Sequence, residues 1–572
     1  MPCRLRHVLI ALPKSVYDRV LTRITNDGIF HVEEPYKILP GSPSPTYKKL
    51  YLQASEKVSK VVNFFQYLGV EPQTEKGLVI EVKGWEETFD KVLKNYAELE
   101  TFFEDKISKI VDVETKADEI RLREELKSRL TELVRYYTYL MTFREVFRAF
   151  SSGLESSSMF FIEGYVDEND FEKLKKALDE EAGQSYMLVD MGIVKGKAGT
   201  PTKVTFPPIV SSFHKITQMY GEPESQEIVP TLFLTVTFPV VFALMFPDAG
   251  HGLVLALFGL LYFGKKNPAW RDILVVLGVA AIVTGLLSGE FFGPLGGHLL
   301  DKIFFGRIGH LPPLALPTYA IEKGLSGAVE ELLFRAVTVC LWVGAFMLSF
   351  GTLLGALNAW VRGDTEELIA MRLPRFLFFA SIALPFLTST NVSDATSTLS
   401  KAFFEMGGGE IKATLILVGV SIGLLWMLLG EPIFALKHGY GVGSAFISSF
   451  MEAFDSILMA LGNIPSFLRI LALALAHSSI MLGFYYIYHE MAHKGIAGLM
   501  IGLVLYAFGN AIAIAIEAII AFAQTMRLHF YEWFSKFYRG TGIPFTPITL
   551  PEGVKVILAS PQPSEIQQKS LS

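Results

Sequence analysis

The second part of the chain contains apolar runs long enough to cross a lipid bilayer, and this feature restricts what the chain can fold into. A helix needs about 20 mostly apolar residues to span the hydrocarbon core of a membrane. Such runs follow one another after about residue 225, whereas the residues before it are rich in charge and contain none. We therefore expect a polar domain over 1–225, a membrane domain over 226–540 and a C-terminal tail over 541–572.

The composition agrees with this division. The mean hydropathy is +0.38, yet 19% of the residues are charged, which is too many for a chain that lies wholly in the membrane. The net charge of -6 gives no indication of nucleic-acid binding. Two cysteines, Cys3 and Cys340, are too few for a disulfide framework or a thiolate metal cage. The apolar run at the N-terminus is too short for a signal peptide, so we expect a cytoplasmic N-terminal domain.

Eight membrane spans are expected. They lie near 229–246, 251–265, 272–294, 333–360, 374–390, 411–430, 445–487 and 497–534. The second run is short and abuts the first, so these two can form a helical hairpin. The last two are so long that their helices must tilt, kink or project into water. Lysine and arginine are more frequent in the loops that an N-in arrangement places inside, which favours cytoplasmic N- and C-termini.

Two small α/β lobes joined by a helical arm are expected in the polar domain. Strand, helix and strand patterns occur over 4–33 and again over 158–190. Between them, the segments 92–113 and 126–140 repeat apolar residues at spacings of three and four, which is typical of a helical hairpin or short coiled coil. Lys106 interrupts the first of these seams, so two amphipathic helices in a compact domain are the alternative.

Charged residues inside the apolar runs are the strongest functional signal, because each costs several kcal/mol in hydrocarbon unless it is paired or hydrated. Arg469 lies deep in the seventh run, in the segment GNIPSFLRILALALAHSSIMLGF. His477 follows about 12 Å along the helix axis, and Asp455 precedes Arg469 by about 21 Å. These groups can mark a polar track, although His477 can equally be a packing residue and Asp455 a solvated one.

The eighth run carries a second set of polar residues. Glu517 lies well inside the run, and Gln524 and Arg527 lie farther along the same helix. Glu517 can serve as the buried ion-pair partner of Arg469 or take part in transport. Arg527 can be an interfacial residue that extends its side chain toward water.

Several motifs resemble the membrane subunit of V-type and archaeal-type rotary ATPases, called subunit a or subunit I. The most specific is IPSFLRILALALAH around Arg469, taken with Glu517 and Arg527 on the next helix. FPVVFALMFPDAGHGL around Asp248 resembles the first hairpin of this family, although proline stands where a glycine usually precedes the aspartate. GLLSGEFFG around Glu290 resembles another recurring segment. The resemblance extends over nearly the whole chain, and we expect its shortness relative to many members to lie in the helical arm.

The resemblance implies a stator that turns ion flow into rotation. Two aqueous half-channels reach a rotor ring from opposite sides, and a permanently charged arginine between them keeps the passing rotor carboxyl ionised. Residue by residue, Arg469 and Arg527 would face the ring. His477 and Glu517 would line the outer half-channel. The remaining matched positions would be Asp248 and Glu290 on the outer path and Asp455 toward the cytoplasm. Gln524, one turn before Arg527 on the same side of the helix, is expected to take part in proton translocation as well.

The resemblance also implies partners. These are proteolipid rotor-ring subunits (c/K type), peripheral-stalk subunits (E/G or E/H type), a central-stalk subunit (d/C type) and membrane lipids, with no nucleic acid. It implies a multi-pass protein, in the plasma membrane if the source is archaeal or bacterial. The selective carboxyl lies on the rotor, so protons and sodium, and ATP synthesis and hydrolysis, stay open.

Other functions fit the sequence less well. A secondary ion or solute transporter is the alternative, but no repeated half-structure with matching interrupted spans is visible. A non-conducting scaffold would leave the buried charges without a purpose. GKAGTPTK at 196–203 lacks the spacing of a phosphate-binding loop, and no zinc or nucleophile motif is present. We expect no enzyme activity of its own, no cofactor and no metal. Asn391 begins a weak glycosylation motif on an expected outer loop.

Overall fold

A computed structural model describes residues 4–33, 42–111, 116–193, 199–300, 312–322, 324–389, 392–406, 410–439 and 441–558. Asn391 lies outside these ranges. The chain divides into two compact units, of which Val204–Ile543 is called here the apolar unit. The other combines Cys3–Lys203 with Pro544–Ser572 and is called the polar unit. Residues 544–558, expected in a C-terminal tail, are thus part of the polar unit, and the units divide some twenty residues before the change in composition.

The α/β part of the polar unit is one antiparallel sheet. Its strands are β1 (Leu5–Pro13), β2 (Phe30–Glu33), β3 (Ser42–Pro43), β5 (Leu154–Glu155), β6 (Met159–Asp167) and β7 (Met187–Ile193). β1 pairs with β6 along its whole length, from Leu5 opposite Asp167 to Pro13 opposite Met159. The prediction of two separate lobes is therefore wrong, because strands from 4–33 and from 158–190 belong to one sheet and one hydrophobic core. Helices α1 (Tyr17–Asp27) and α7 (Phe171–Ala182) contribute apolar side chains to that core.

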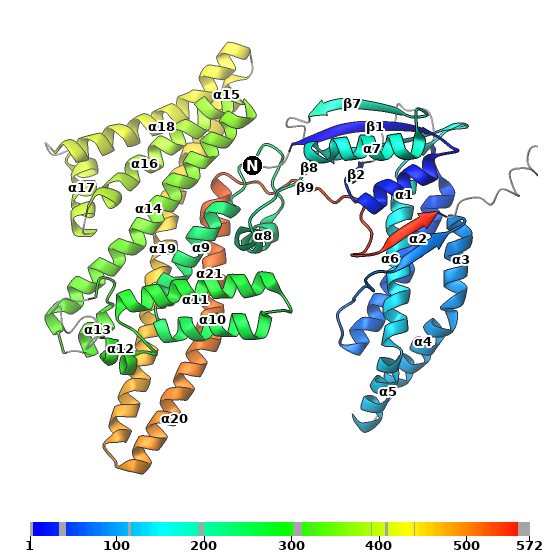
Figure 1. Cartoon of the computed structure of the whole chain (residues 1–572). Helices are drawn as coiled ribbons and strands as arrows, with labels where there is room; N and C mark the ends of the chain where they lie inside the picture. Colours follow the sequence, from blue (N-terminus) through cyan, green and yellow to red (C-terminus); the bar gives the residue numbers. More distant parts are fainter. Residues whose placement is uncertain are drawn as a thin grey trace, which may run out of the picture. The chain divides into compact units, whose positions relative to one another are not determined.

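A helical bundle extends from this sheet (Figure 1). Its helices are α2 (Pro45–Leu68), α3 (Trp85–Asn95), α4 (Ala97–Val111), α5 (Lys116–Ser128) and α6 (Leu130–Ser151). The two heptad segments run antiparallel, since Lys106 forms an ion pair with Glu125 at 2.5 Å and Arg129 lies over the ring of Phe102. The polar residue that interrupts the apolar seam is thus paired across it. α2 was not expected from the sequence, and its apolar residues pack in the same core.

The C-terminal segment completes the polar unit. Strand β10 (Lys555–Leu558) pairs in parallel with β4 (Val79–Val82). The amide of Asn26 binds the backbone of Val556 on both sides, accepting from its N–H at 3.0 Å and donating to its carbonyl at 2.9 Å. Ile548 and Val556 are buried in the core. The 340 residues of 204–543 therefore separate the two parts of one folded unit.

A substitution in β10 tests this return of the chain. Val556→Asp places a charge in the core and should destabilise the polar unit by about 2–4 kcal/mol. Ile557→Asp changes the next residue, which is 52% exposed, and should cost less than about 0.5 kcal/mol. Limited proteolysis of the full chain should cut the first variant within 4–203 much faster than the second. Equal cleavage would contradict the packing of this strand.

The apolar unit is helical. Among the described residues, six helices are long and apolar enough to cross a membrane: Pro268–Ser288, Ser326–Arg362, Thr365–Thr388, Ile411–His438, Val442–Ala492 and Ile496–Lys536. The other two expected spans form α9 (Thr231–Met245) and α10 (Ala249–Phe263), each of 15 residues. Fifteen residues make about 22 Å of helix, less than the hydrocarbon thickness of about 30 Å. Of the eight membrane spans expected from the sequence, six are therefore long enough to cross the hydrocarbon core.

The first helical hairpin consists of α10 and α11 (Pro268–Ser288), which lie side by side, rather than α9 and α10 as expected (Figure 1). Two glycines allow the close approach of the two backbones. A Cβ on Gly252 would lie 2.7 Å from the carbonyl oxygen of Gly278, and a Cβ on Gly278 would lie 2.6 Å from that of Gly252. The short loop from Gly264 to Asn267 joins the helices.

The two long C-terminal helices are confirmed in length. α19 (Val442–Ala492) is continuous over 51 residues, about 77 Å. The second runs from Ile496 to Lys536 and includes α20 (Ile496–Ile512) and α21 (Ala518–Arg527). α19 and α20 pack side by side (Figure 1). A helix whose length is more than twice the hydrocarbon thickness must tilt or project beyond the membrane. Because either is possible, the strong tilt of these two helices stays a prediction.

Candidate functional site

His477 on α19 is the centre of a buried polar cluster. Its side chain is 1% exposed, and its Nδ1 is hydrogen-bonded to the carboxylate of Glu517. Glu517 ends a π-helical turn, Ala513–Glu517, between α20 and α21. Such a turn inserts one extra residue into a helix and changes the direction in which the following side chains point. The two sequence-predicted residues of the seventh and eighth runs are therefore in direct contact.

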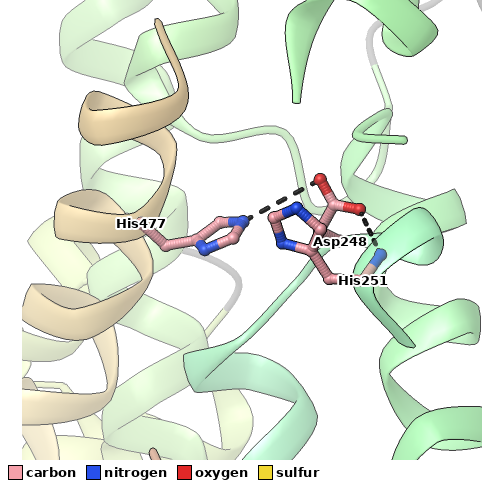
Figure 2. Close-up of side chains that lie close together, drawn as sticks. All are labelled: Asp248, His251 and His477. Carbon is pink, nitrogen blue, oxygen red and sulfur yellow. Dashed lines mark hydrogen bonds and ion pairs between the residues drawn. The ribbon is translucent and has the colours of Figure 1, made fainter. Parts of the chain in front are cut away.

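Asp248 lies opposite His477, in the loop between α9 and α10. Figure 2 shows its carboxylate between His477 and the backbone N–H of His251. Its Oδ1 accepts hydrogen bonds from the N–H groups of His251 at 3.0 Å and Phe292 at 2.9 Å, and its Oδ2 accepts from Gly293 at 2.6 Å. The same Oδ2 is 3.9 Å from His477 Nε2. Asp248 thus caps α10 and also fixes the loop that follows α11.

Glu290 is the third carboxylate near His477. It follows α11, and its Oε2 lies 3.8 Å from His477 Nε2. Ser478 donates a hydrogen bond to its other oxygen. His251 also belongs to this group, and its Nε2 lies 2.7 Å from Oδ1 of Asn510. Together these residues are called the histidine cluster: Asp248, His251, Glu290, His477, Ser478, Asn510 and Glu517.

A second polar group lies nearer the start of α19. Arg375 on α16 (Leu373–Thr388) forms ion pairs with Asp455 at 3.3 Å and Glu452 at 3.5 Å, and donates to Ser456 at 3.0 Å. These four residues are called the Arg375 cluster. Asp455 is exposed, but it is paired rather than simply solvated.

Arg469 lies between the two clusters on α19. It is half-buried, and its Nη1 is buried without a hydrogen-bond partner among the described residues. Gln524 is similar, since its Oε1 is buried and unpartnered within the same described ranges. Arg527 is exposed. The alternative in which Arg469 and Glu517 form an ion pair is not found, because Glu517 binds His477.

Six residues of these clusters were not singled out from the sequence: His251, Ser478, Asn510, Arg375, Glu452 and Ser456. Ser478 follows His477 directly, and Asn510 is an amide inside the eighth apolar run. His251 belongs to the Gly-His-Gly segment after Asp248. Arg375 lies at the edge of an expected span, where it is one of the basic residues that favour the inside of the membrane. A polar residue within an apolar run was a usable signal for Asn510 and Ser478, whereas the partners of Arg375 depend on tertiary packing.

Removing the Asp248 carboxylate tests whether its hydrogen bonds stabilise the fold. Asp248→Ala leaves three backbone N–H groups without their acceptor, and each unsatisfied buried donor costs about 1–3 kcal/mol. We expect a loss of at least about 3 kcal/mol, seen as a lower Tm of the purified chain and poor recovery from membranes. Asp248→Asn keeps one acceptor oxygen and should lose less. Asp394→Ala, at an exposed position of α17 (Val392–Phe404), should leave the Tm unchanged. An unchanged Tm in Asp248→Ala would refute the capping role.

Comparisons with known proteins agree with the resemblance noted from the sequence. The sequence model of the V-type ATPase 116kDa subunit family matches residues 76–293 and 411–550. A-type ATP synthase subunit I of Aeropyrum pernix is 36% identical, over 98% of this chain and 99% of that protein. A-type ATP synthase subunit I of Saccharolobus solfataricus is 31% identical, over 75% of this chain and 66% of that protein.

The similarity also extends to a V-type ATPase subunit of a plant. V-type proton ATPase subunit a1 of Arabidopsis thaliana is 23% identical, over 66% of this chain and 56% of that protein. The alignment with the Aeropyrum protein extends over 681 residues, more than the 572 of this chain. That relative therefore contains segments that this chain lacks.

Proposed function

The chain belongs to the V-type ATPase 116kDa subunit family, and from this premise we propose that it is the ion-conducting stator subunit of a rotary ATPase. In this role the chain does not bind ATP itself. It provides two half-channels to a ring of rotor subunits, each with a carboxyl group in the membrane. The polar unit and the C-terminus lie in the cytoplasm. The observation that carries the proposal is Arg469, a half-buried guanidinium without an ion-pair partner among the described residues.

The chemistry of Arg469 suits a partner outside this chain. A guanidinium stays protonated at every accessible pH, and a charge in apolar surroundings is costly unless it is compensated. A rotor carboxylate that passes Arg469 would supply the opposite charge. While it does so, its ionised form is favoured and it cannot keep a proton. A lysine would serve less well, because burial readily removes its charge.

The two clusters on α19 suit the two half-channels. The histidine cluster and the Arg375 cluster lie on opposite sides of Arg469, about 12 Å and about 20 Å away along the helix axis. In each cluster, acidic and basic groups within 4 Å can hold water and pass protons. We assign the histidine cluster to the outer half-channel and the Arg375 cluster to the cytoplasmic one. Gln524 and Arg527 join Arg469 on the side of the ring.

Substitution of Arg469 tests the function. Arg469→Ala should abolish ATP-driven proton uptake by reconstituted vesicles while the complex still assembles, because no buried counter-charge within the described chain is left unpaired. Arg469→Lys should fail as well, since it loses the fork geometry and the permanent charge. Arg335→Ala removes an exposed arginine whose ion-pair partner in the described part of the chain is Glu331 on its own helix, and should pump normally.

Arg375→Ala is expected to impair assembly, in contrast to Arg469→Ala. Arg375 is 13% exposed and has acidic partners, and breaking a buried pair costs about 3–5 kcal/mol. This variant should assemble poorly. Normal pumping by Arg469→Ala or Arg469→Lys would refute the assigned role. Loss of assembly in Arg469→Ala would make Arg469 a structural residue instead.

The polar unit is the part of the stator that we expect to bind the peripheral stalk. Its helical bundle, α2 to α6, shares one core with the sheet and so can transmit force as a rigid body. Cross-linking of the assembled complex followed by mass spectrometry tests this role. Cross-links from lysines of 45–151 to peripheral-stalk subunits are expected. Cross-links from this range to rotor subunits alone would contradict the anchoring role.

A further inference from the structure

We propose that Asp248, His251 and His477 form a binding site for a divalent transition metal such as Zn²⁺. One ligand atom from each of the three residues lies within 4.8 Å of the others. All three side chains are buried, and Figure 2 shows them facing one another. Asp248 and His251 lie three residues apart at the start of α10, whereas His477 belongs to α19, more than 200 residues later, so the sequence alone does not bring the three ligands together.

His477 offers a nitrogen lone pair to this site. Its Nδ1 faces the carboxylate of Glu517, which can only accept a hydrogen bond when ionised. The proton of a neutral ring therefore lies on Nδ1, and Nε2 carries the lone pair. That Nε2 is buried without a hydrogen-bond partner among the described residues. A carboxylate behind a histidine is also the arrangement that orients metal-binding histidines and raises their basicity.

His251 offers a second lone pair for a similar reason. The amide nitrogen of Asn510 donates to the carbonyl of Tyr506 at 2.9 Å, so its Oδ1 is the atom that faces His251. Because this oxygen can only accept, His251 Nε2 carries the proton. His251 Nδ1 then has the lone pair, and it too is buried and unpartnered within the described part of the chain.

The carboxylates supply the remaining ligands. Asp248 accepts three backbone hydrogen bonds, two on Oδ1 and one on Oδ2. A carboxylate has about four lone pairs, so one is left on Oδ2, the atom nearest His477 Nε2. Glu290 Oε2 lies 3.8 Å from the same nitrogen and is buried without a hydrogen-bond partner in the described residues. It can serve as a fourth ligand.

The ligand set and its spacing select the class of metal. Two imidazoles with carboxylate oxygen suit Zn²⁺ and its neighbours, whereas Mg²⁺ and Ca²⁺ prefer oxygen alone. Zinc bonds of about 2.0–2.2 Å in a tetrahedron place the ligand atoms roughly 3.4 Å apart. His477 Nε2 lies 3.8 Å and 3.9 Å from the two carboxylate oxygens. Shifts of about half an ångström at these two contacts bring the atoms to the spacing of ligands around zinc, and the ligand atom of His251 lies within 4.8 Å of those of Asp248 and His477.

The consequence for transport rests on the proposed function. If His477 and its carboxylates pass protons in the outer half-channel, a metal bound to His477 Nε2 takes the position that a proton would occupy. Zinc added to the outer side should therefore stop proton transport. The binding site itself does not depend on this role, so the two can be tested separately.

Zinc binding is measured on the purified full chain by equilibrium dialysis against buffered Zn²⁺, with the bound metal counted by atomic emission. The polar unit contains another group of possible ligands, His7, Glu33 and Glu163, so binding is taken as the difference between variants. His251→Gln should bind zinc at least about ten-fold more weakly than the wild type at one site. His489→Gln, which removes an exposed histidine near His493, should bind like the wild type.

Cobalt provides a spectroscopic test of the same site. Co²⁺ in a site with two imidazoles and a carboxylate should give visible absorption bands in the wild-type chain that Zn²⁺ abolishes and that are weaker in His251→Gln. Absence of these bands, or equal zinc affinity in wild type and His251→Gln, would overturn the site. Proton uptake by wild-type vesicles without zinc tests the proposed function independently. Its failure together with intact zinc binding would contradict the function and leave the site standing.

Discussion

A charge in apolar surroundings has to be compensated, and the arrangement of the apolar unit follows from this constraint. His477 is surrounded by carboxylates from the loops beside α10 and α11 and from the eighth run. Arg375 is paired with two acidic residues of α19. Arg469 lies between these groups, and its buried Nη1 has no hydrogen-bond partner among the described residues. In the proposed function its charge is compensated by a partner outside this chain.

Close backbone packing brings the histidine cluster together. The glycines of α10 and α11 allow these helices to touch, and Gly285 lies directly against Ala249. The loops at Asp248 and Glu290 then meet at one end of the hairpin, where the N–H of Ala249 donates to the carbonyl of Glu290 at 3.1 Å. Phe292 adopts a φ of 48° there, a conformation that costs about 1–2 kcal/mol in a residue other than glycine. The hydrogen bonds to Asp248 compensate for it.

Sequence reasoning identified the elements better than their contacts. Arg469, His477 and Glu517 were recognisable because ionisable groups are rare in apolar runs. The contact of His477 with Asp248 could not be recognised in the sequence, since it depends on how α10 and α11 pack against α19. Similarly, the alternation of β1 and β6 predicted strands, but nothing local indicates that strands from two separate segments pair. The return of 544–558 to the polar unit depends on β10, a strand of four residues that is too short to give a clear pattern.

In the proposed function the two clusters on α19 open to opposite sides of the membrane and are separated by Arg469. The accessibility of two cysteines to Ag⁺, a small ion that follows water and blocks thiols, tests this arrangement. Ser478→Cys and Ser456→Cys are introduced into a chain in which Cys3 and Cys340 are replaced by serine, and proton uptake is followed in sealed vesicles. We expect Ser478→Cys to be blocked only by Ag⁺ on the outer side, and Ser456→Cys only by Ag⁺ on the cytoplasmic side. Reaction of both cysteines from the same side would contradict it.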